Sequence, residues 1–205
     1  MIHVDQVIKI KVMSKIYHAV LLSLFIIITL QASKRPDPVI VDAIQKVYNK
    51  TWYSGYLDIK DTKLQNVTHH MHYFFFPSQN NVSTDPLLFW FNGGPGCSSL
   101  LGAFYEHGPF LIHDAFGMLM YNKYSWNQNA SVVYIESPSE VGFSYIDNKP
   151  KNYSWNDDAV AVLNRDAVLE FFNVFTEFKN RKTYIAGESY AGIYVPTLFE
   201  KYSFS

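Results

Sequence analysis

Several features that define common protein classes are scarce in this 205-residue sequence. Only 17% of its residues are charged, and 17 Lys and Arg residues nearly balance 18 Asp and Glu residues. A nucleic-acid-binding protein needs a basic patch or stripe, so this balance predicts no nucleic-acid partner. A disordered chain would combine low hydrophobicity with high net charge, which a 48% hydrophobic content excludes. The length and apolar content therefore suit one folded domain, or part of a larger one.

Cysteine is almost absent, since Cys97 is the only one. Its thiol must be free, bonded to another chain, or missing its partner in this sequence. Three closely spaced histidines, His69, His70 and His72, could suggest a metal site. No cysteine or acidic cluster accompanies them, so we expect structural roles for them and no bound metal.

The N-terminal 33 residues have the pattern of a signal peptide. Basic Lys9, Lys11 and Lys15 precede an apolar run from 19 to 30, and small residues follow it at 32 and 33. Twelve apolar residues are fewer than the ~20 that span a membrane, so we expect no stable membrane anchor. An uncleaved anchor is the alternative. We thus divide the chain into a signal peptide, 1–33, and a folded part, 34–205.

Entry into the secretory pathway predicts N-glycosylation. Five Asn-X-Ser/Thr sites lie beyond the apolar segment, each a weak signal alone. The candidate asparagines are Asn49, Asn66, Asn81, Asn129 and Asn152.

The folded part alternates short apolar runs with one long helical pattern. Short runs bounded by turn residues indicate buried strands. Apolar residues from Val160 to Phe175 recur at helical spacing, and Asp157 or Asp158 can cap that helix. A second helical tendency starts at Ala191 and is complicated by Pro196. This alternation predicts an α/β fold with a mostly parallel central sheet and flanking helices. The expected strands cover 52–59, 70–76, 87–91, 131–135 and 183–186, and the long helix covers 157–178.

A serine stands at the turn between the last strand and the second helix. Gly187 lies two residues before Ser189 and Ala191 two residues after it. A nucleophile elbow needs such small residues because its tight turn brings neighbouring backbone close. The helix that follows favours developing negative charge at its amino end, and the Tyr190 N–H would be one oxyanion donor. Taken alone, this pattern also fits an ordinary strand-to-helix loop.

A glycine-rich loop, residues 92–99, follows the strand at 87–91. Its glycines allow backbone N–H groups to approach a ligand. It is not a phosphate-binding loop, because it lacks the Lys-Ser/Thr ending and Pro95 removes one amide donor. It resembles the oxyanion loop of α/β-hydrolases, although a purely structural turn is the alternative.

Three motifs together resemble the serine carboxypeptidases, a family of α/β-hydrolases. They are Asn92-Gly93-Gly94-Pro95-Gly96-Cys97-Ser98-Ser99, Gly142-Phe143-Ser144-Tyr145, and Gly187-Glu188-Ser189-Tyr190-Ala191-Gly192. The resemblance runs from about Pro36 to Tyr202. It implies a serine-type carboxypeptidase that releases C-terminal residues from peptides through an acyl-enzyme, without metal or cofactor.

The resemblance also implies roles for single residues. Ser189 would be the acylating nucleophile, and the N–H groups of Gly94 and Tyr190 would form the oxyanion hole. Asn92, Glu106 and Glu188 would hold the free carboxylate of the substrate, with Trp90 as a pocket wall beside them. Two adjacent carboxyl groups cannot both ionise cheaply, so one keeps a proton and can donate it in a hydrogen bond. Substrate affinity should therefore fall as pH rises above mildly acidic. For Glu106, a solvated surface position is the alternative.

The sequence also departs from the family pattern. Small residues are usual near Ser139 and Glu140, so a charge at Glu140 puts this part of the substrate cleft in doubt, and Ile193 stands where His is common. In α/β-hydrolases the triad Asp and His follow the serine, yet neither occurs after Ser189. In the family, the cysteine matching Cys97 pairs with one far downstream. We therefore expect an enzyme cut short after its elbow, and this part alone to be inactive.

Two further functions stay open. An acyltransferase of the same fold would use the same acyl-enzyme, and a truncated, non-catalytic binding protein would keep the carboxylate site alone. The expected partner is a peptide or protein with a free C-terminus, and the family suggests a homodimer for a full-length protein. The expected location is the secretory pathway, ending in a lysosome or vacuole or outside the cell.

Overall fold

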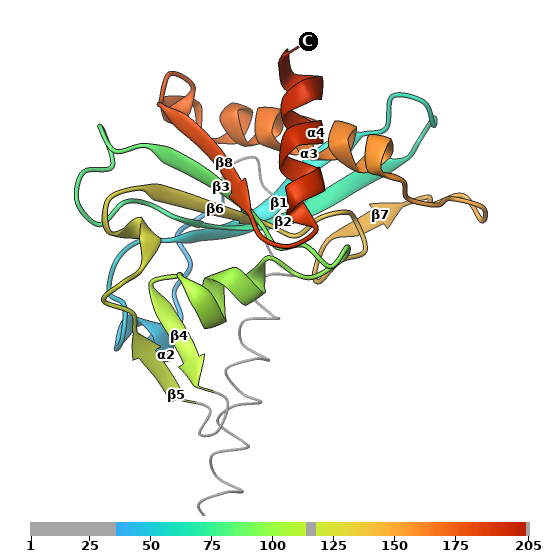
Figure 1. The fold of residues 1–205 in the computed structure, drawn as a ribbon. Helices are drawn as coiled ribbons and strands as arrows, with labels where there is room; N and C mark the ends of the chain where they lie inside the picture. Colours follow the sequence, from blue (N-terminus) through green and yellow to red (C-terminus); the bar gives the residue numbers. More distant parts are fainter. Residues whose placement is uncertain (1–35, 114–117, 204–205) are drawn as a thin grey trace, which may run out of the picture.

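The computed structural model describes residues 36–113 and 118–203. The predicted signal peptide therefore lies outside the described residues. A six-stranded mixed sheet forms the centre of the fold (Figure 1). Its main path runs in the order β1-β2-β6-β3-β8, and β7 pairs with β2 beside that path. These strands are β1 (Tyr53–Lys60), β2 (Thr68–Phe76), β3 (Leu87–Phe91), β6 (Ser131–Ile135), β7 (Tyr145–Asp147) and β8 (Thr183–Gly187).

The sheet has a parallel part and an antiparallel part. β3 lies between β6 and β8 and runs parallel to both. β2 runs antiparallel to β1, β6 and β7. The α/β class is thus confirmed, and its parallel pairing within the described residues is confined to β6, β3 and β8. The antiparallel pairing of β1 and β2 follows from the short turn between them, which leaves no room for the crossover that parallel strands need.

The predicted strands are confirmed to within about two residues, and the runs at 87–91 and 131–135 match β3 and β6 fully. Both runs are continuous and apolar because parallel strands are covered on both faces. The smaller elements are the helix α2 (Asp42–Gln45), a π-helix (Gly102–Glu106), the hairpin of β4 (Phe110–His113) and β5 (Met118–Tyr121), and 3₁₀ turns at Trp126–Gln128 and Thr176–Phe178.

Helices α3 (Asp157–Val174) and α4 (Ala191–Ser203) cover one face of the sheet, and α2 and the hairpin lie toward the other (Figure 1). The helix α3 begins at the cap Asn156, whose side chain accepts the Ala159 N–H at 2.9 Å. It ends four residues earlier than predicted, because Phe175 leaves helical geometry. Pro196 does not stop α4, whose Ala191, Tyr194 and Leu198 are buried in the core.

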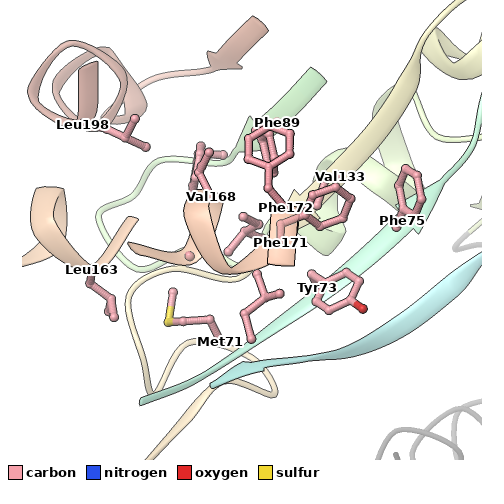
Figure 2. Close-up of a cluster of buried hydrophobic side chains, with 14 of the residues drawn as sticks. Met71, Tyr73, Phe75, Phe89, Val133, Leu163, Val168, Phe171, Phe172 and Leu198 are labelled. Atoms are coloured by element: carbon pink, nitrogen blue, oxygen red, sulfur yellow. The ribbon is translucent and has the colours of Figure 1, made fainter. Parts of the chain in front are cut away.

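The core on the helical face is rich in aromatic rings (Figure 2). Phe171 of α3 packs edge-on against Phe75 of β2 and Phe89 of β3, with ring centroids 5.2 Å apart in both pairs. Alternate residues of β2, Phe74 and Phe76, enter a second core on the opposite face. Because β3 and β8 pair in parallel, the loops that follow them are placed at one edge of the sheet.

Candidate functional site

The turn after β8 has the geometry of a nucleophile elbow. Ser189 has φ 54°, a left-handed conformation that is unusual for a side chain other than glycine. A Cβ on Gly187 would collide with the Phe91 carbonyl and the Ala191 side chain. The Ala191 N–H then bonds the Glu188 carbonyl at 2.9 Å as α4 begins. Small residues at 187 and 191 are therefore required by close backbone approach, as the sequence predicted.

The glycine-rich loop lies directly against this elbow. Phe91 pairs with Gly187 in the parallel ladder, so both loops leave the sheet at the same level. Gly93 is buried, and a Cβ there would collide with the Tyr190 amide nitrogen. Gly94 follows with φ +107°, which side chains rarely adopt. The two motifs thus meet backbone to backbone, and no larger residue fits between them.

The amides of Gly94 and Tyr190 belong to the two loops that meet here. The backbone hydrogen bonds of the described residues use neither N–H as a donor. A pair of N–H groups without an internal acceptor, beside a strained serine, suits an oxyanion that develops during acyl transfer. The Tyr190 side chain has a partner of its own, since its hydroxyl donates to the Asp157 carboxylate at 2.9 Å.

Asn92 brings the three predicted carboxylate-binding residues together. Its side-chain nitrogen donates to the Glu106 carboxyl at 3.1 Å and to the Glu188 carboxyl at 2.9 Å. Its side-chain oxygen accepts the Trp90 indole N–H at 2.8 Å and the Gly102 N–H at 3.1 Å. Because both ends of this buried amide are occupied, its orientation is fixed, and two carboxyl groups converge on one nitrogen.

The pKa of Glu106 depends on its burial and on the groups beside it. Partial burial raises the pKa of Glu106, the Asn92 hydrogen bond opposes that rise, and the nearby Glu188 charge adds to it. The side chain of Glu106 is 33% exposed, so a solute can reach it. A carboxyl group that keeps its proton in mild acid is a hydrogen-bond donor to another carboxylate.

Trp90 and His107 form a buried wall behind the carboxyl pair. The Trp90 ring packs edge-on against His107 at 4.3 Å, and His107 stacks on Trp126 at 4.0 Å. Burial lowers the pKa of His107 to about 4. Its Nδ1 contacts the Tyr134 hydroxyl at 2.9 Å, whereas Nε2 has no hydrogen-bond partner among the described residues and lies 3.9 Å from Glu106. A neutral imidazole therefore stands beside the acidic pair.

A cavity of about 500 Å³ adjoins the elbow and the glycine-rich loop. Its lining includes Gly96, Tyr190 and Glu140. Glu140 has φ 80° and forms an ion pair with Lys149 at 2.7 Å. The position is thus conformationally suited to glycine, which gives a physical reason for expecting a small residue there.

Four supporting residues had no predicted role. The Ser99 hydroxyl accepts the Asn92 N–H at 3.1 Å, and a Cβ on Gly102 would collide with the Trp90 indole nitrogen. Glu136 is completely buried and bonded to the Ser98 hydroxyl. The two serines belong to the glycine-rich motif, but sequence spacing alone gives no indication of their partners.

The remaining predictions concern glycosylation, the single cysteine, metal binding and membrane crossing. Each of the five candidate glycosylation asparagines is exposed. Cys97 is exposed and free among the described residues. Within 36–113 and 118–203, no group of three or more His, Cys, Asp or Glu residues is arranged to hold a metal ion. No helix in that part of the chain combines the length and apolar character needed to cross a membrane.

Comparison with known proteins gives concordant matches. Residues 42–203 match the family described as serine carboxypeptidase. The lysosomal protective protein of Mus musculus is 53% identical over 146 residues, which is 71% of this chain and 29% of that protein. A serine carboxypeptidase of Caenorhabditis elegans is 50% identical over 147 residues, 71% of this chain and 25% of that protein. The chain thus spans about a quarter to a third of these relatives.

The crystal structure of a prohormone-processing carboxypeptidase from Saccharomyces cerevisiae has a similar fold. It matches with a TM-score of 0.64 and 27% sequence identity. The match covers 82% of this chain and 36% of that one.

Proposed function

Because this chain belongs to the serine carboxypeptidase family, we propose that it carries the nucleophile and the carboxylate-binding group of an acid-acting carboxypeptidase. The observation that carries the proposal is Asn92, whose amide joins Glu106 and Glu188 immediately beside the elbow of Ser189. An exopeptidase must recognise a terminal carboxylate, and a carboxyl pair that retains a proton can donate to it.

The chemistry follows from the two loops. The Ser189 hydroxyl attacks the last peptide carbonyl, and the N–H groups of Gly94 and Tyr190 stabilise the resulting oxyanion. Collapse of this intermediate releases the C-terminal residue and leaves an acyl-enzyme, which water hydrolyses. A base must take the proton from the hydroxyl and pass it to the leaving amine. In this fold the Asp and His partners follow the serine, so we propose that the intact protein supplies them beyond residue 205.

The location belongs to the same proposal. The match to a lysosomal protein supports a secretory or lysosomal compartment for this chain. A lysosome is acidic, and because burial raises the pKa of Glu106, acid favours the protonated carboxyl group that this proposal needs.

Two peptides that differ only at the C-terminus test the proposal. The intact natural protein is incubated near pH 5 with a peptide acid and with its C-terminal amide, and a fluorophosphonate probe is used to label the nucleophile. We expect labelling at Ser189, release of the last residue from the acid, and at least tenfold slower release from the amide. The Ser189→Ala variant is the control for labelling and turnover. Labelling at another residue would refute the nucleophile, and equal release from both peptides would refute carboxylate recognition.

A further inference from the structure

We propose that Ser98 and Glu136 are positioning residues that hold the glycine-rich loop against the elbow. The effect on acyl transfer rests on the proposed function, whereas the holding of the loop does not. Glu136 directly follows β6 and is fully buried, although it is an acidic residue. A carboxyl group in such a place is costly unless hydrogen bonds satisfy it, so its partners show what it does.

Three donors converge on the Glu136 carboxyl group. His72 Nδ1 lies 2.8 Å from it, and the Phe143 N–H donates to the same oxygen at 2.8 Å. The Ser98 hydroxyl donates to the other oxygen. His72 is itself fully buried, and its second ring nitrogen contacts the Ser54 hydroxyl at 2.9 Å. The carboxyl group is therefore fixed from the sheet side by β1 and β2, before it contacts the loop.

The motif at 142–144 serves the same carboxyl group. Gly142 has φ +57°, and a Cβ there would collide with the Glu136 side chain. Phe143 gives its N–H, and the Ser144 hydroxyl donates to the Glu136 backbone carbonyl at 2.7 Å. In this motif, Gly142 leaves room for the Glu136 side chain, Phe143 donates to it, and Ser144 bonds its backbone. None of these residues belongs to the elbow or to the carboxylate site.

Ser98 connects this buried network to the loop. Its hydroxyl accepts the Leu100 N–H at 3.2 Å while it donates to Glu136. One residue earlier, the Cys97 N–H bonds the Gly93 carbonyl at 3.0 Å and closes the turn around Gly94. Asn92 fixes the start of the loop and Glu136 fixes its end. The position of the Gly94 N–H, between them, depends on both.

The decisive variant is Ser98→Ala, which removes the hydroxyl and leaves Glu136 with two donors. In the intact natural protein we expect at least tenfold faster hydrogen exchange across residues 93–99. We also expect about 10- to 100-fold slower fluorophosphonate labelling of Ser189, because a small displacement of an oxyanion donor costs that much. Ser98→Thr keeps the hydroxyl and should restore both rates.

Two more variants separate positioning from general stability. Ser144→Ala also removes a hydroxyl that contacts Glu136, but this hydroxyl bonds the Glu136 backbone carbonyl and the His72 N–H, not the carboxyl group that Ser98 contacts. It should lower the melting temperature without changing either rate more than twofold. Glu136→Gln offers one acceptor oxygen to three donors, so it should change both rates in the same direction as Ser98→Ala. Unchanged exchange in Ser98→Ala and Glu136→Gln would overturn the proposal. A wild-type protein that the probe does not label would refute the proposed function, while exchange would still decide this one.

Discussion

Asn92 organises the site because both ends of its side-chain amide are fully used in hydrogen bonds. Its oxygen accepts two N–H groups, from Trp90 and Gly102, and its nitrogen donates to two carboxyl groups. An aspartate of the same shape would place a third carboxylate against Glu106 and Glu188. The neutral amide is therefore the side chain that lets the acidic pair sit close together in a partly buried place.

Replacing Glu106 by Gln should remove most of the pH dependence of substrate affinity. The raised pKa of Glu106 means that its proton persists to higher pH and is lost as pH rises through that value. In the wild type, KM for a peptide acid should therefore increase between pH 5 and pH 7. In Glu106→Gln, KM at pH 5 should be about tenfold higher, since a charged hydrogen-bond pair is weakened, yet it should vary little with pH.

Asp58→Asn is the matched control, since Asp58 is an exposed carboxylate on β1 that contacts His70. Its pH profile of KM should follow the wild type. A Glu106→Gln profile parallel to the wild type would assign the titration to another group.

His107 should destabilise the fold in acid. Its pKa is about 4 in the folded protein and about 6.5 when exposed, so between these values the unfolded chain binds the extra proton. The free energy of unfolding must then fall as pH drops from 6.5 to 4, by about 2–3 kcal/mol at pH 4.5. His107→Phe keeps a ring against Trp126 and should show a shallower decline, measured by urea unfolding at pH 7 and pH 4.5. Parallel declines in both proteins would exclude this histidine as the cause.

Single residues differ in how far the sequence could predict them. Ser189 and Gly93 lie in local patterns whose physical requirement is a tight turn, and the structure places both in such turns. Glu136 could not be predicted, because its partners His72 and Ser98 are 64 and 38 residues away in the chain. Hydrogen bonds between distant side chains leave no periodic signal in a sequence.

Among the secondary-structure elements, those with a distinctive apolar pattern were predictable, whereas several short elements without one were not. The strands β3 and β6 are continuous apolar runs because both faces are covered, and such runs are distinctive. The hairpin strand β5 has the exposed residues Met118 and Met120, and β7 has only three residues. The π-helix at Gly102–Glu106 depends on Gly102 meeting Trp90, which is a tertiary contact. Local sequence alone specifies none of these.

Helix α3 should depend strongly on Phe171. This ring is fully buried and stacks on Phe175 at 4.8 Å while it packs edge-on against Phe75 and Phe89. Phe171→Ala should lower the free energy of unfolding by about 3–5 kcal/mol, through lost burial and a residual cavity. Phe199→Ala, on α4, is the control, because that ring is 64% exposed and its loss should cost less than about 1 kcal/mol. Denaturant unfolding measures both, and equal losses would contradict the packing described for α3.

Across the whole molecule, the site lies at one edge of the sheet and meets the second core at Trp90. Aromatic cores cover both faces, whereas the chemistry-bearing side chains lie in loops after β3, β6 and β8. In the parallel part of a sheet, the loops that follow the strands meet at one edge. The rigid layers therefore fix the strand ends, and the loops can place charged groups together without entering the cores.

Glycosylation tests the predicted passage of the whole molecule through the secretory pathway. The five candidate asparagines are exposed, so a transferase could reach each of them in the folded chain. Expressed with residues 1–33 in a secreting eukaryotic cell, the protein should run faster on a gel after glycan removal by peptide-N-glycosidase. Asn49→Gln and Thr51→Ala disrupt the same site in two ways, so both should remove the same single glycan. Replacing all five asparagines by Gln should abolish the mobility change. An unmodified wild-type protein retained in the cytosol would refute the signal peptide, because exposed acceptor sites are modified only after translocation.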